Sequence, residues 1–312
     1  MRRRMLRAGG LLLVATLAAC ARIPTSGPVE QSRQGEVSEP NPVVVIAAGP
    51  QPNSPPEQIV NDYLAAAAAG LSNALDFSVA RTYLSGDAVA TWNPLGGVLV
   101  VDSTQKVDQP SDTQVTVEAS VAGRLDADGS YSETPREAAP ETVTFGMIQD
   151  TAGQWRIKDP PDGLILTARQ FQDQFREVSL YFLTPDESSL VPDPRWYPAV
   201  NLATSVVKGL LAGPAPWLRD AVKTEIPQGV TLSPESVTVS PTGQAAVVLS
   251  PGSAVQAANR ALLVAQIQGT LAQVAPVRSV VVQAGADGPQ LQGSTQLTTA
   301  ARKPLADPEM IR

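Results

Sequence analysis

The sequence predicts an α+β protein in which two small α+β domains follow a leader and a proline-rich tether. Apolar residues recur at helical spacing over residues 56–84 and then alternate with polar residues over residues 98–157, which is typical of antiparallel strands. The segment 159–163, Asp-Pro-Pro-Asp-Gly, ends this series, and a second group of helices and strands follows it. Because helices and strands are grouped, the pattern favours α+β over a parallel α/β sheet.

The first 19 residues have the features of a secretory leader. Four arginines precede an apolar run that is much shorter than the roughly 20 residues needed to span a bilayer. The run ends in Leu17-Ala18-Ala19-Cys20, which resembles the lipobox of bacterial lipoproteins. That resemblance implies cleavage between Ala19 and Cys20, a diacylglyceryl group on the Cys20 sulfur and an acyl group such as palmitate on its amine. Since two or more acyl chains anchor a protein stably, we expect attachment to the outer face of the cytoplasmic membrane.

The charge balance excludes one class of partner. Loss of residues 1–19 removes four positive charges and no negative ones, so the formal net charge of -7 becomes -11. An acidic chain without a basic run after Arg7 lacks the electrostatic surface that nucleic-acid binding requires. It also has no basic surface for anionic headgroups, so membrane attachment depends on the lipid.

The sequence contains no histidine and one cysteine. The missing histidines exclude Ser-His-Asp and Cys-His catalytic arrangements and remove the usual ligands of zinc, copper and haem. The single cysteine excludes an intramolecular disulfide. We therefore expect no catalytic residue, no metal site and no cofactor.

A tether and two helices are expected before the first strands. Prolines recur through residues 20–55 among serine, glycine and glutamine, which predicts a proline-rich tether. Ser54-Pro55-Pro56-Glu57 combines a cap residue, a proline at the first helical position and an acid, which predicts a helix that ends at Gly70. A shorter helix is expected over 76–84.

Strands are expected over the rest of the first domain, which we place at residues 56–160. Alternating apolar residues predict strands near 98–101, 115–121, 143–147 and 155–157. Asp128-Gly129 and Ala152-Gly153 supply hairpin turns. This order of elements resembles small cystatin-like and nuclear-transport-factor-like folds.

A second domain is expected over residues 177–286, after a linker helix over 161–176 and before a loose tail over 287–312. Its expected elements are a strand at 178–182, a loop with Trp196 and Tyr197, a helix at 199–211, a hairpin at 237–249, a helix at 253–274 and a strand at 280–282.

Several segments of this half resemble a GerMN domain, the module named from spore-germination proteins. They include Leu180-Tyr181-Phe182, the helix end Leu210-Leu211-Ala212-Gly213-Pro214, Ile226-Pro227 and Gly269-Thr270-Leu271. A lipobox followed by Ile23-Pro24-Thr25-Ser26-Gly27-Pro28, and a first domain that closes in Gly153-Gln154-Trp155-Arg156-Ile157, extend the likeness. The whole order resembles the actinobacterial LpqB lipoprotein family.

The family resemblance implies a partner, and the sequence differs from the family in one respect. Members of the LpqB family continue past the GerMN domain into a β-propeller, whereas the printed sequence ends at Arg312 and has no blade repeat. The resemblance implies an accessory of the MtrA/MtrB two-component system that contacts the extracytoplasmic part of the sensor histidine kinase. Envelope and cell-division signalling would be its setting.

Two motifs resemble functional sites, and the pattern favours an ordinary role for each. Ser205-Val206-Val207-Lys208 matches the S-x-x-K nucleophile motif, but no K-T-G or S-x-N element accompanies it and it lies in an amphipathic helix. Asp126 and Glu137 stand at positions one and twelve of a calcium-type loop, but Tyr131 occupies the position that requires glycine. A hairpin explains that stretch better.

Aromatic residues beside prolines are the candidate partner contacts. Trp196, Tyr197 and Trp217 combine a large apolar surface with a polar group, as binding hot spots often do. The alternative is that they cover the end of their own core.

Three function classes remain after these observations. The favoured one is a non-enzymatic binding or regulatory lipoprotein. A substrate-binding lipoprotein of an ABC transporter would share the lipobox, although such proteins usually have two lobes built on parallel sheets around a cleft. A cell-wall enzyme that uses Ser205 is the third and has the least support.

Overall fold

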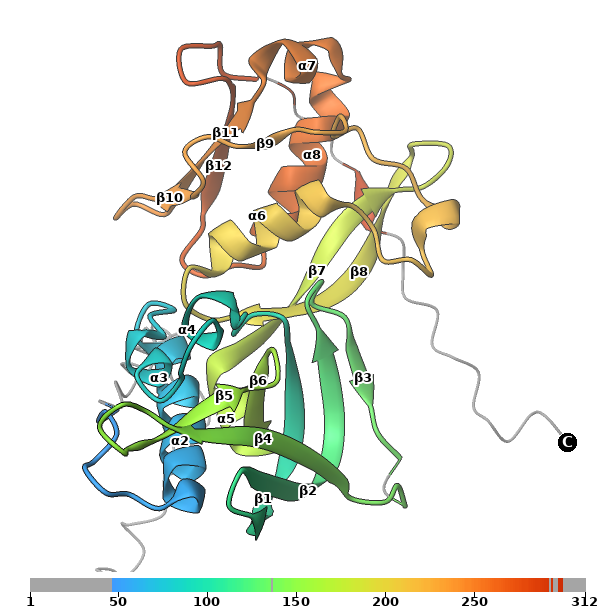
Figure 1. Ribbon diagram of the computed structural model, residues 1–312. Helices are drawn as coiled ribbons and strands as arrows, with labels where there is room; N and C mark the ends of the chain where they lie inside the picture. The colour runs from blue at the N-terminus through green and yellow to red at the C-terminus, as the bar shows by residue number, and fades with distance from the viewer. Residues whose placement is uncertain (1–46, 136, 292, 294–296, 300–312) are drawn as a thin grey trace, which may run out of the picture. The chain divides into compact units, whose positions relative to one another are not determined.

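The computed structural model describes residues 47–299 except 136, 292 and 294–296. All described residues belong to one compact unit, Val43–Arg312. Within this unit two domains have separate hydrophobic cores. The predicted α+β class is confirmed (Figure 1). Within the described ranges, no helix combines the length and apolar character that a membrane span requires.

The first domain is a six-stranded sheet with helix α2 packed on it (Figure 1). The strand order is β5-β4-β2-β1-β6, with β3 paired to β2. Its elements are α2 Pro56–Ser72, α3 Ser78–Arg81, α4 Ala88–Thr91, β1 Gly97–Ser111, β2 Gln114–Asp126, β3 Tyr131–Glu133, β4 Glu141–Gln149, β5 Trp155–Asp159 and β6 Leu164–Thr167. The predicted hairpin turns join β2 to β3 and β4 to β5.

Helix α2 begins and ends differently from the prediction. Its N-cap is Pro55, without a side-chain cap hydrogen bond, so Ser54 is not the cap. The proline at the first helical position is Pro56, and its fixed φ suits that position. Gly70 does not end the helix, because it lies inside the last turn against the ring of Phe77.

Gly70 is required by this contact. A Cβ at residue 70 would lie 2.5 Å from Phe77 Cδ1 and 2.9 Å from the Asp76 carbonyl oxygen. We expect Gly70→Ala to lower the free energy of unfolding by about 1 to 3 kcal/mol despite its better helix propensity. Urea unfolding checks this, with Asn61→Ala on the exposed face of α2 as the control, which should be neutral or slightly stabilising. Equal stability of the two variants would contradict it.

The segment after the first hairpins is partly a strand. We expected one linker helix over 161–176, but β6 covers Leu164–Thr167 and pairs in parallel with β1. A short apolar run does not separate strand from helix by periodicity, which is why the prediction is wrong. Only α5, Ala168–Gln174, is helical, and a capping box between Thr167 and Gln170 fixes its start.

The start of the described chain packs on this domain. We expected residues 47–55 to belong to the tether. The hydroxyl of Tyr83 donates to Ala48 O at 2.8 Å, and the backbone N–H of Asn53 donates to Gln154 Oε1 at 2.6 Å. These bonds hold the segment that leads into α2.

The second domain combines two sheets with helices α6 and α8 (Figure 1). One sheet has the order β10-β11-β12 with β9 paired to β11, and the other has the order β13-β8-β7. Its elements are β7 Phe175–Leu183, β8 Ser189–Pro198, α6 Leu202–Ala212, η1 Arg219–Ala221, β9 Thr231–Leu232, β10 Thr238–Val239, β11 Gln244–Ser250, α7 Gly252–Ala257, α8 Arg260–Leu271, β12 Ser279–Ala284 and β13 Thr298–Thr299.

Strand β8 stands where we predicted a loop around Trp196-Tyr197. In the register with β7, Pro192 lies opposite Tyr181, and Pro194 belongs to the same row. Trp196, two residues further in this row, donates its backbone N–H away from β7, to Gly129 O at 2.8 Å. Residues in the row that contains the prolines therefore direct their backbone N–H groups away from β7. The N–H groups that proline lacks would not have formed hydrogen bonds to β7, so the pairing of the two strands loses nothing.

Two further predictions in this half are corrected. The expected helix over 253–274 is divided into α7 and α8, because Ala258 and Asn259 have extended backbone and Asn259 is the N-cap of α8. The expected loose tail over 287–312 is partly folded. Leu291 donates its N–H to Val282 O at 2.8 Å, and β13 pairs with β8.

Candidate functional site

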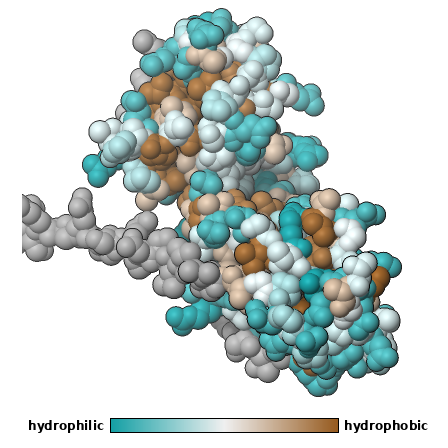
Figure 2. Space-filling view, turned by 60° about the vertical axis from the view of Figure 1, so that its left-hand side comes forward, coloured by the Kyte–Doolittle hydropathy of each residue, from teal (hydrophilic) through white to brown (hydrophobic). Residues whose placement is uncertain are grey.

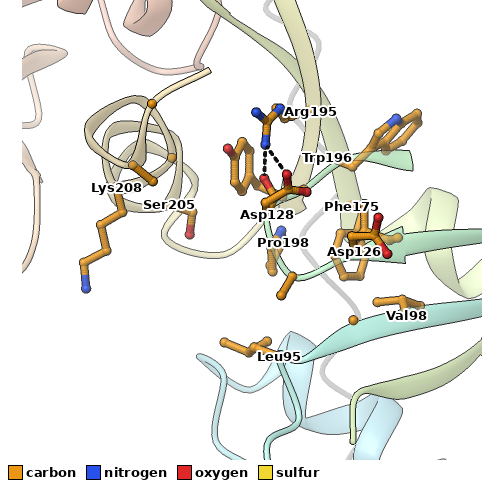
Figure 3. A pocket seen from close by; sticks show the side chains of 18 of the residues that line it. Leu95, Val98, Asp126, Asp128, Phe175, Arg195, Trp196, Pro198, Ser205 and Lys208 are labelled. Carbon is orange, nitrogen blue, oxygen red and sulfur yellow. Dashed lines mark hydrogen bonds and ion pairs between the residues drawn. The ribbon is translucent and has the colours of Figure 1, made fainter. Parts of the chain in front are cut away.

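A cleft of about 430 Å³ lies where the two domains meet (Figure 3). The first domain contributes Leu95, Val98 and the hairpin 125–129 to its wall. The second domain contributes the end of β8 and one face of α6. Its volume is within the range of natural ligand pockets, roughly 300 to 1,000 Å³.

Arg195 on β8 ties the two walls together. Its Nε and Nη2 atoms donate to both carboxylate oxygens of Asp193, at 3.1 Å and 2.9 Å. Its Nη1 atom donates to the backbone oxygen of Asp128 and lies 3.2 Å from Asp128 Oδ2 (Figure 3). The side chains of Arg195 and Asp193 are 3% and 1% exposed, so this is a buried ion pair with an exposed third member.

The carboxylates around Arg195 are fully engaged. Asp193 also accepts the backbone N–H of Ala215 at 2.9 Å. Burial acts to raise the pKa of Asp128, but hydrogen bonds from Ser130 and the charge of Arg195 outweigh it and lower that pKa. For Arg195 burial acts to lower the pKa, and the hydrogen bond and charge of Asp193 outweigh it and raise that pKa. Arg195 and Asp128 therefore stay charged around neutral pH.

Tyr197 lines the cleft and packs against Gly209 of helix α6. Any side chain at Gly209 would overlap the Tyr197 hydroxyl. That hydroxyl is buried, and none of the described residues forms a hydrogen bond with it. Burial raises its pKa well above the ordinary value, so it stays protonated.

Removing this hydroxyl has a predictable effect. A buried donor without a partner loses its hydrogen bonds to water and gains nothing in return. We expect Tyr197→Phe to leave the free energy of unfolding unchanged or to raise it by up to about 1 kcal/mol. Tyr83→Phe is the matched comparison, because the Tyr83 hydroxyl donates to Ala48 O and its loss should be destabilising. Chemical unfolding of both variants measures the difference, and a loss of stability in Tyr197→Phe would contradict the prediction.

An aromatic cluster braces the junction beside the cleft. Trp196 lies 5.0 Å from Phe171 and 5.9 Å from Tyr131 between ring centroids. Phe171 also stacks on Phe175, the first residue of β7, at 4.8 Å. The cluster joins α5 and β3 of the first domain to β7 and β8 of the second domain.

Comparison with known proteins identifies both domains. The family model described as Lipoprotein LpqB, N-terminal domain, matches residues 49–172. The model described as Sporulation and spore germination, or Germane, matches residues 179–291. The chain belongs to the LpqB lipoprotein family. The expected GerMN module is thereby confirmed.

Curated LpqB relatives match along most of this chain. The Lipoprotein LpqB of Cutibacterium acnes is 29% identical over 286 residues, which cover 91% of this chain and 46% of the relative. That of Mycobacterium bovis is 33% identical over 298 residues, which cover 90% and 48%. That of Thermobifida fusca is 31% identical over 242 residues, which cover 72% and 37%. The chain spans less than half the length of these relatives.

No solved structure matches the chain significantly. The likeness of the LpqB N-terminal domain to cystatin-like or nuclear-transport-factor-like folds therefore stays a prediction.

In this LpqB-family chain, residues singled out from separate motifs line one cleft. Trp196 and Tyr197 belong to its wall, as do Asp126, Ser205 and Lys208. Tyr197 is buried in the second core and Trp196 is half-buried, whereas Trp217 is 70% exposed. Trp217 directly follows the cleft residue Pro216. Contact of these aromatic residues with a partner stays a prediction.

Ser205 and Lys208 do not form a catalytic pair in the structure. Both lie on α6, but their side chains point apart (Figure 3), and the Lys208 ammonium lies 3.7 Å from Glu235 Oε2. In the described ranges, no hydrogen bond joins Ser205 to Lys208. The arrangement therefore lacks the activated serine that the S-x-x-K motif requires.

The stretch from Asp126 is the β2–β3 hairpin, as the sequence favoured. Gly129 donates its backbone N–H to Asp126 O at 2.9 Å, which closes the turn. Asp128 is engaged by Arg195, and Glu137 is exposed. Within the part of the chain that the structure describes, no three acidic, cysteine or histidine side chains gather as a metal site would need.

One predicted site lies outside the described residues, and one observed charged pair was not predicted. Cys20 and the cleavage position after Ala19 lie outside the described residues. The buried pair of Asp193 and Arg195 was not predicted from the sequence. A signal was present, because a spacing of two on a strand places both charges on the same face as Tyr197.

Proposed function

We propose that the chain is a membrane-anchored lipoprotein of the cell envelope that acts by binding and has no chemistry of its own. Membership of the LpqB family supports this, since the relatives bear the name lipoprotein and no enzyme name. We further propose attachment through Cys20 at the outer face of the cytoplasmic membrane. The proposed partner is the extracytoplasmic domain of the sensor kinase in the MtrA/MtrB system.

The exposure of Trp217 carries the proposal. A tryptophan side chain that is 70% exposed is unusual, and tryptophan is enriched at the centres of protein interfaces. It follows Pro216, a cleft residue, and the partly exposed Leu95 lines the same cleft. A partner that covers this region would bury apolar surface that water now contacts.

The mechanism would be a shift in the kinase's conformational equilibrium. A bound protein moves such an equilibrium only by the difference between its affinities for the two states. The lipoprotein would therefore contact one signalling state of the kinase better than the other, without covalent chemistry.

A binding measurement tests the partner. The mature lipidated chain in nanodiscs is presented to the purified extracytoplasmic kinase domain, and affinity is measured by biolayer interferometry. We expect specific binding that weakens about tenfold or more in Trp217→Ala. Ile148→Ala is the matched control, because Ile148 is also an exposed apolar residue but lies on β4, outside the cleft wall. Absence of binding at any accessible concentration would refute the partnership.

Replacement of Cys20 tests the anchor separately. Cys20→Ala removes the thiol that the lipid requires, so we expect the protein to move from the membrane to the soluble fraction. The near-ultraviolet circular dichroism and melting temperature should stay unchanged, because each described domain has a hydrophobic core of its own. Retention in the membrane fraction would contradict the proposed lipid attachment.

The alternative of a transporter-linked binding protein has less structural support. The first sheet is antiparallel except for the β1–β6 pair, so the two parallel-sheet lobes of that class are not present in the described residues. A strong thermal shift with one member of a sugar, peptide or metal panel would favour it.

A further inference from the structure

We propose that the tip of the β2–β3 hairpin, residues 126–130, is a latch that fixes the orientation of the two domains and so creates one partner-binding surface shared by both. The shared surface joins Leu95 of the first domain to Trp217 of the second. The inference rests on the proposed function, because it describes the surface that the proposed partner would contact. Neither family description assigns a role to the hairpin or to such a surface.

One covalent connection joins the two domains in the described ranges. Helix α5 ends at Gln174, and β7 begins at Phe175 without a linker between them. A single crossing of the chain does not prevent rotation, and domains joined by small interfaces usually move relative to each other. The aromatic cluster around Phe171 lies at the crossing itself. A contact further from the crossing resists rotation better, because it acts on a longer lever.

The latch contacts β8 at such a distance. Arg195 lies opposite Val178, three residues beyond the start of β7, which is about 10 Å at the ordinary strand rise. There Trp196 donates its backbone N–H to Gly129 O at 2.8 Å, and Arg195 Nη1 donates to the backbone oxygen of Asp128 (Figure 3). Both acceptors are backbone atoms, so these bonds fix the hairpin itself.

Gly129 allows this close approach. A Cβ at residue 129 would lie 3.1 Å from the Trp196 carbonyl oxygen and 3.3 Å from Arg195 Cβ, so a larger side chain would push the hairpin away from β8. Gly153, in the hairpin between β4 and β5, has a similar positive φ, 75° against 87°. No atom lies within 4 Å of a Cβ built there. The two glycines therefore share a backbone conformation and differ in the contact.

The two apolar anchors of the shared surface lie on different domains. Leu95 is 45% exposed and lines the cleft from the first domain. Trp217 is 70% exposed and follows Pro216, which lines the cleft from the second domain. On the face drawn in Figure 2, brown hydrophobic residues occur on both domains. One partner can bury both anchors at once only if the orientation of the domains is fixed.

The charges around the cleft indicate the chemistry of the partner. They are Asp126, Asp128 and the buried Asp193, and Arg195, Lys208 and Arg219. Three negative charges thus offset three positive ones. A surface without net charge fits a partner whose contacting side chains are mainly apolar, and its affinity should depend little on salt.

Double electron–electron resonance tests the latch. Cys20→Ala removes the single cysteine of the full chain, so nitroxide labels can be placed at Ala65→Cys and Arg260→Cys, exposed positions on α2 and α8. We expect one narrow distance distribution. Gly129→Asn should broaden it and Gly153→Asn should not, because asparagine tolerates the left-handed backbone at both positions. Equal distributions in the two variants would overturn the latch.

A second latch variant covers the case in which Gly129→Asn does not fold. Asp193→Leu/Arg195→Met removes the guanidinium that holds the hairpin and leaves no buried charge without a partner. It should also broaden the distance distribution. An unchanged narrow distribution in this variant would show that the aromatic cluster alone fixes the domains.

Binding of the lipidated chain to the purified kinase domain tests the shared surface. We expect Leu95→Ala to weaken binding about threefold or more. Gly129→Asn should weaken it about threefold or more, because only molecules with the fixed orientation bind fully. Affinity should change less than about twofold between 0.1 and 0.5 M sodium chloride.

The two measurements separate failure of the inference from failure of the proposed function. If the unsubstituted chain binds and either Leu95→Ala or Gly129→Asn binds equally well, the shared surface is wrong while the partnership stands. If the unsubstituted chain does not bind, the partnership and its surface are both refuted, and the label distances still decide whether the hairpin is a latch.

Discussion

Asp193→Ala is expected to destabilise the protein by about 3 to 5 kcal/mol, because it leaves the Arg195 guanidinium buried without its main partner. The Arg195 side chain is 3% exposed, and both of its hydrogen bonds to the Asp193 carboxylate would disappear. The backbone N–H of Ala215 would lose its acceptor in the same variant. Urea unfolding at neutral pH measures the change in free energy.

Two comparison variants show whether buried charge is the cause. Asp128→Ala removes the exposed member of the group, 45% exposed, and should cost less than about 1 kcal/mol. The double variant Asp193→Leu/Arg195→Met removes both buried charges and should recover most of the lost stability. If the double variant is as unstable as Asp193→Ala, packing rather than an unpaired charge is responsible.

The Arg195 group also connects stability to the cleft. Its hydrogen bond to Asp128 O and the bond from Trp196 N to Gly129 O both hold the β2–β3 hairpin against β8. Both segments line the cleft. Loss of Asp193 should therefore loosen the contact between the hairpin and β8 as well as lower the free energy of unfolding.

The first domain was predictable because its signals are local. The alternation of Val115, Val117 and Ala119 places one buried row on β2, and the structure has that row. The parallel strand β6 was not predictable in the same way, because its pairing with β1 joins segments more than 60 residues apart. Sequence periodicity indicates which face of a strand is buried, but it does not indicate which strand pairs with it.

The candidate site was found in pieces. Each motif was interpreted from its neighbouring residues alone. Only the tertiary fold brings Trp196, Asp126 and Ser205 to one cleft. Prolines around Trp196 favoured a loop because proline removes a donor. They did not break β8 because their row faces away from β7, a property of register that the sequence does not display.

The free edge of β7 is closed by side chains of α8 instead of another strand. Tyr181 donates its N–H to Thr270 Oγ1 at 3.0 Å, and its carbonyl accepts from Gln266 Nε2 at 3.1 Å. Gln273, an exposed residue just after the end of α8, makes the same two kinds of bond with Ser179. Buried polar residues on α8 thus satisfy backbone groups that an uncovered edge would expose to other chains.

Gln266→Leu is therefore expected to lower the free energy of unfolding by about 2 to 3 kcal/mol. Gln266 is fully buried, and its Oε1 atom also accepts the N–H of Glu225 at 2.8 Å, so the substitution leaves two backbone groups without partners. Gln268→Leu, at a half-buried position of the same helix, keeps both of these backbone groups hydrogen-bonded. It should change the free energy of unfolding by less than about 0.5 kcal/mol.

Hydrogen exchange separates this edge effect from general loosening of the core. In Thr270→Val, which keeps the side-chain shape, the Tyr181 amide loses its acceptor and should exchange faster. The Leu183 amide should keep its protection relative to global stability, because it donates to Lys223 O, a backbone acceptor that the substitution leaves in place. Equal acceleration at both amides would show that α8 holds the sheet through packing alone, and that its buried polar residues do not specify the edge.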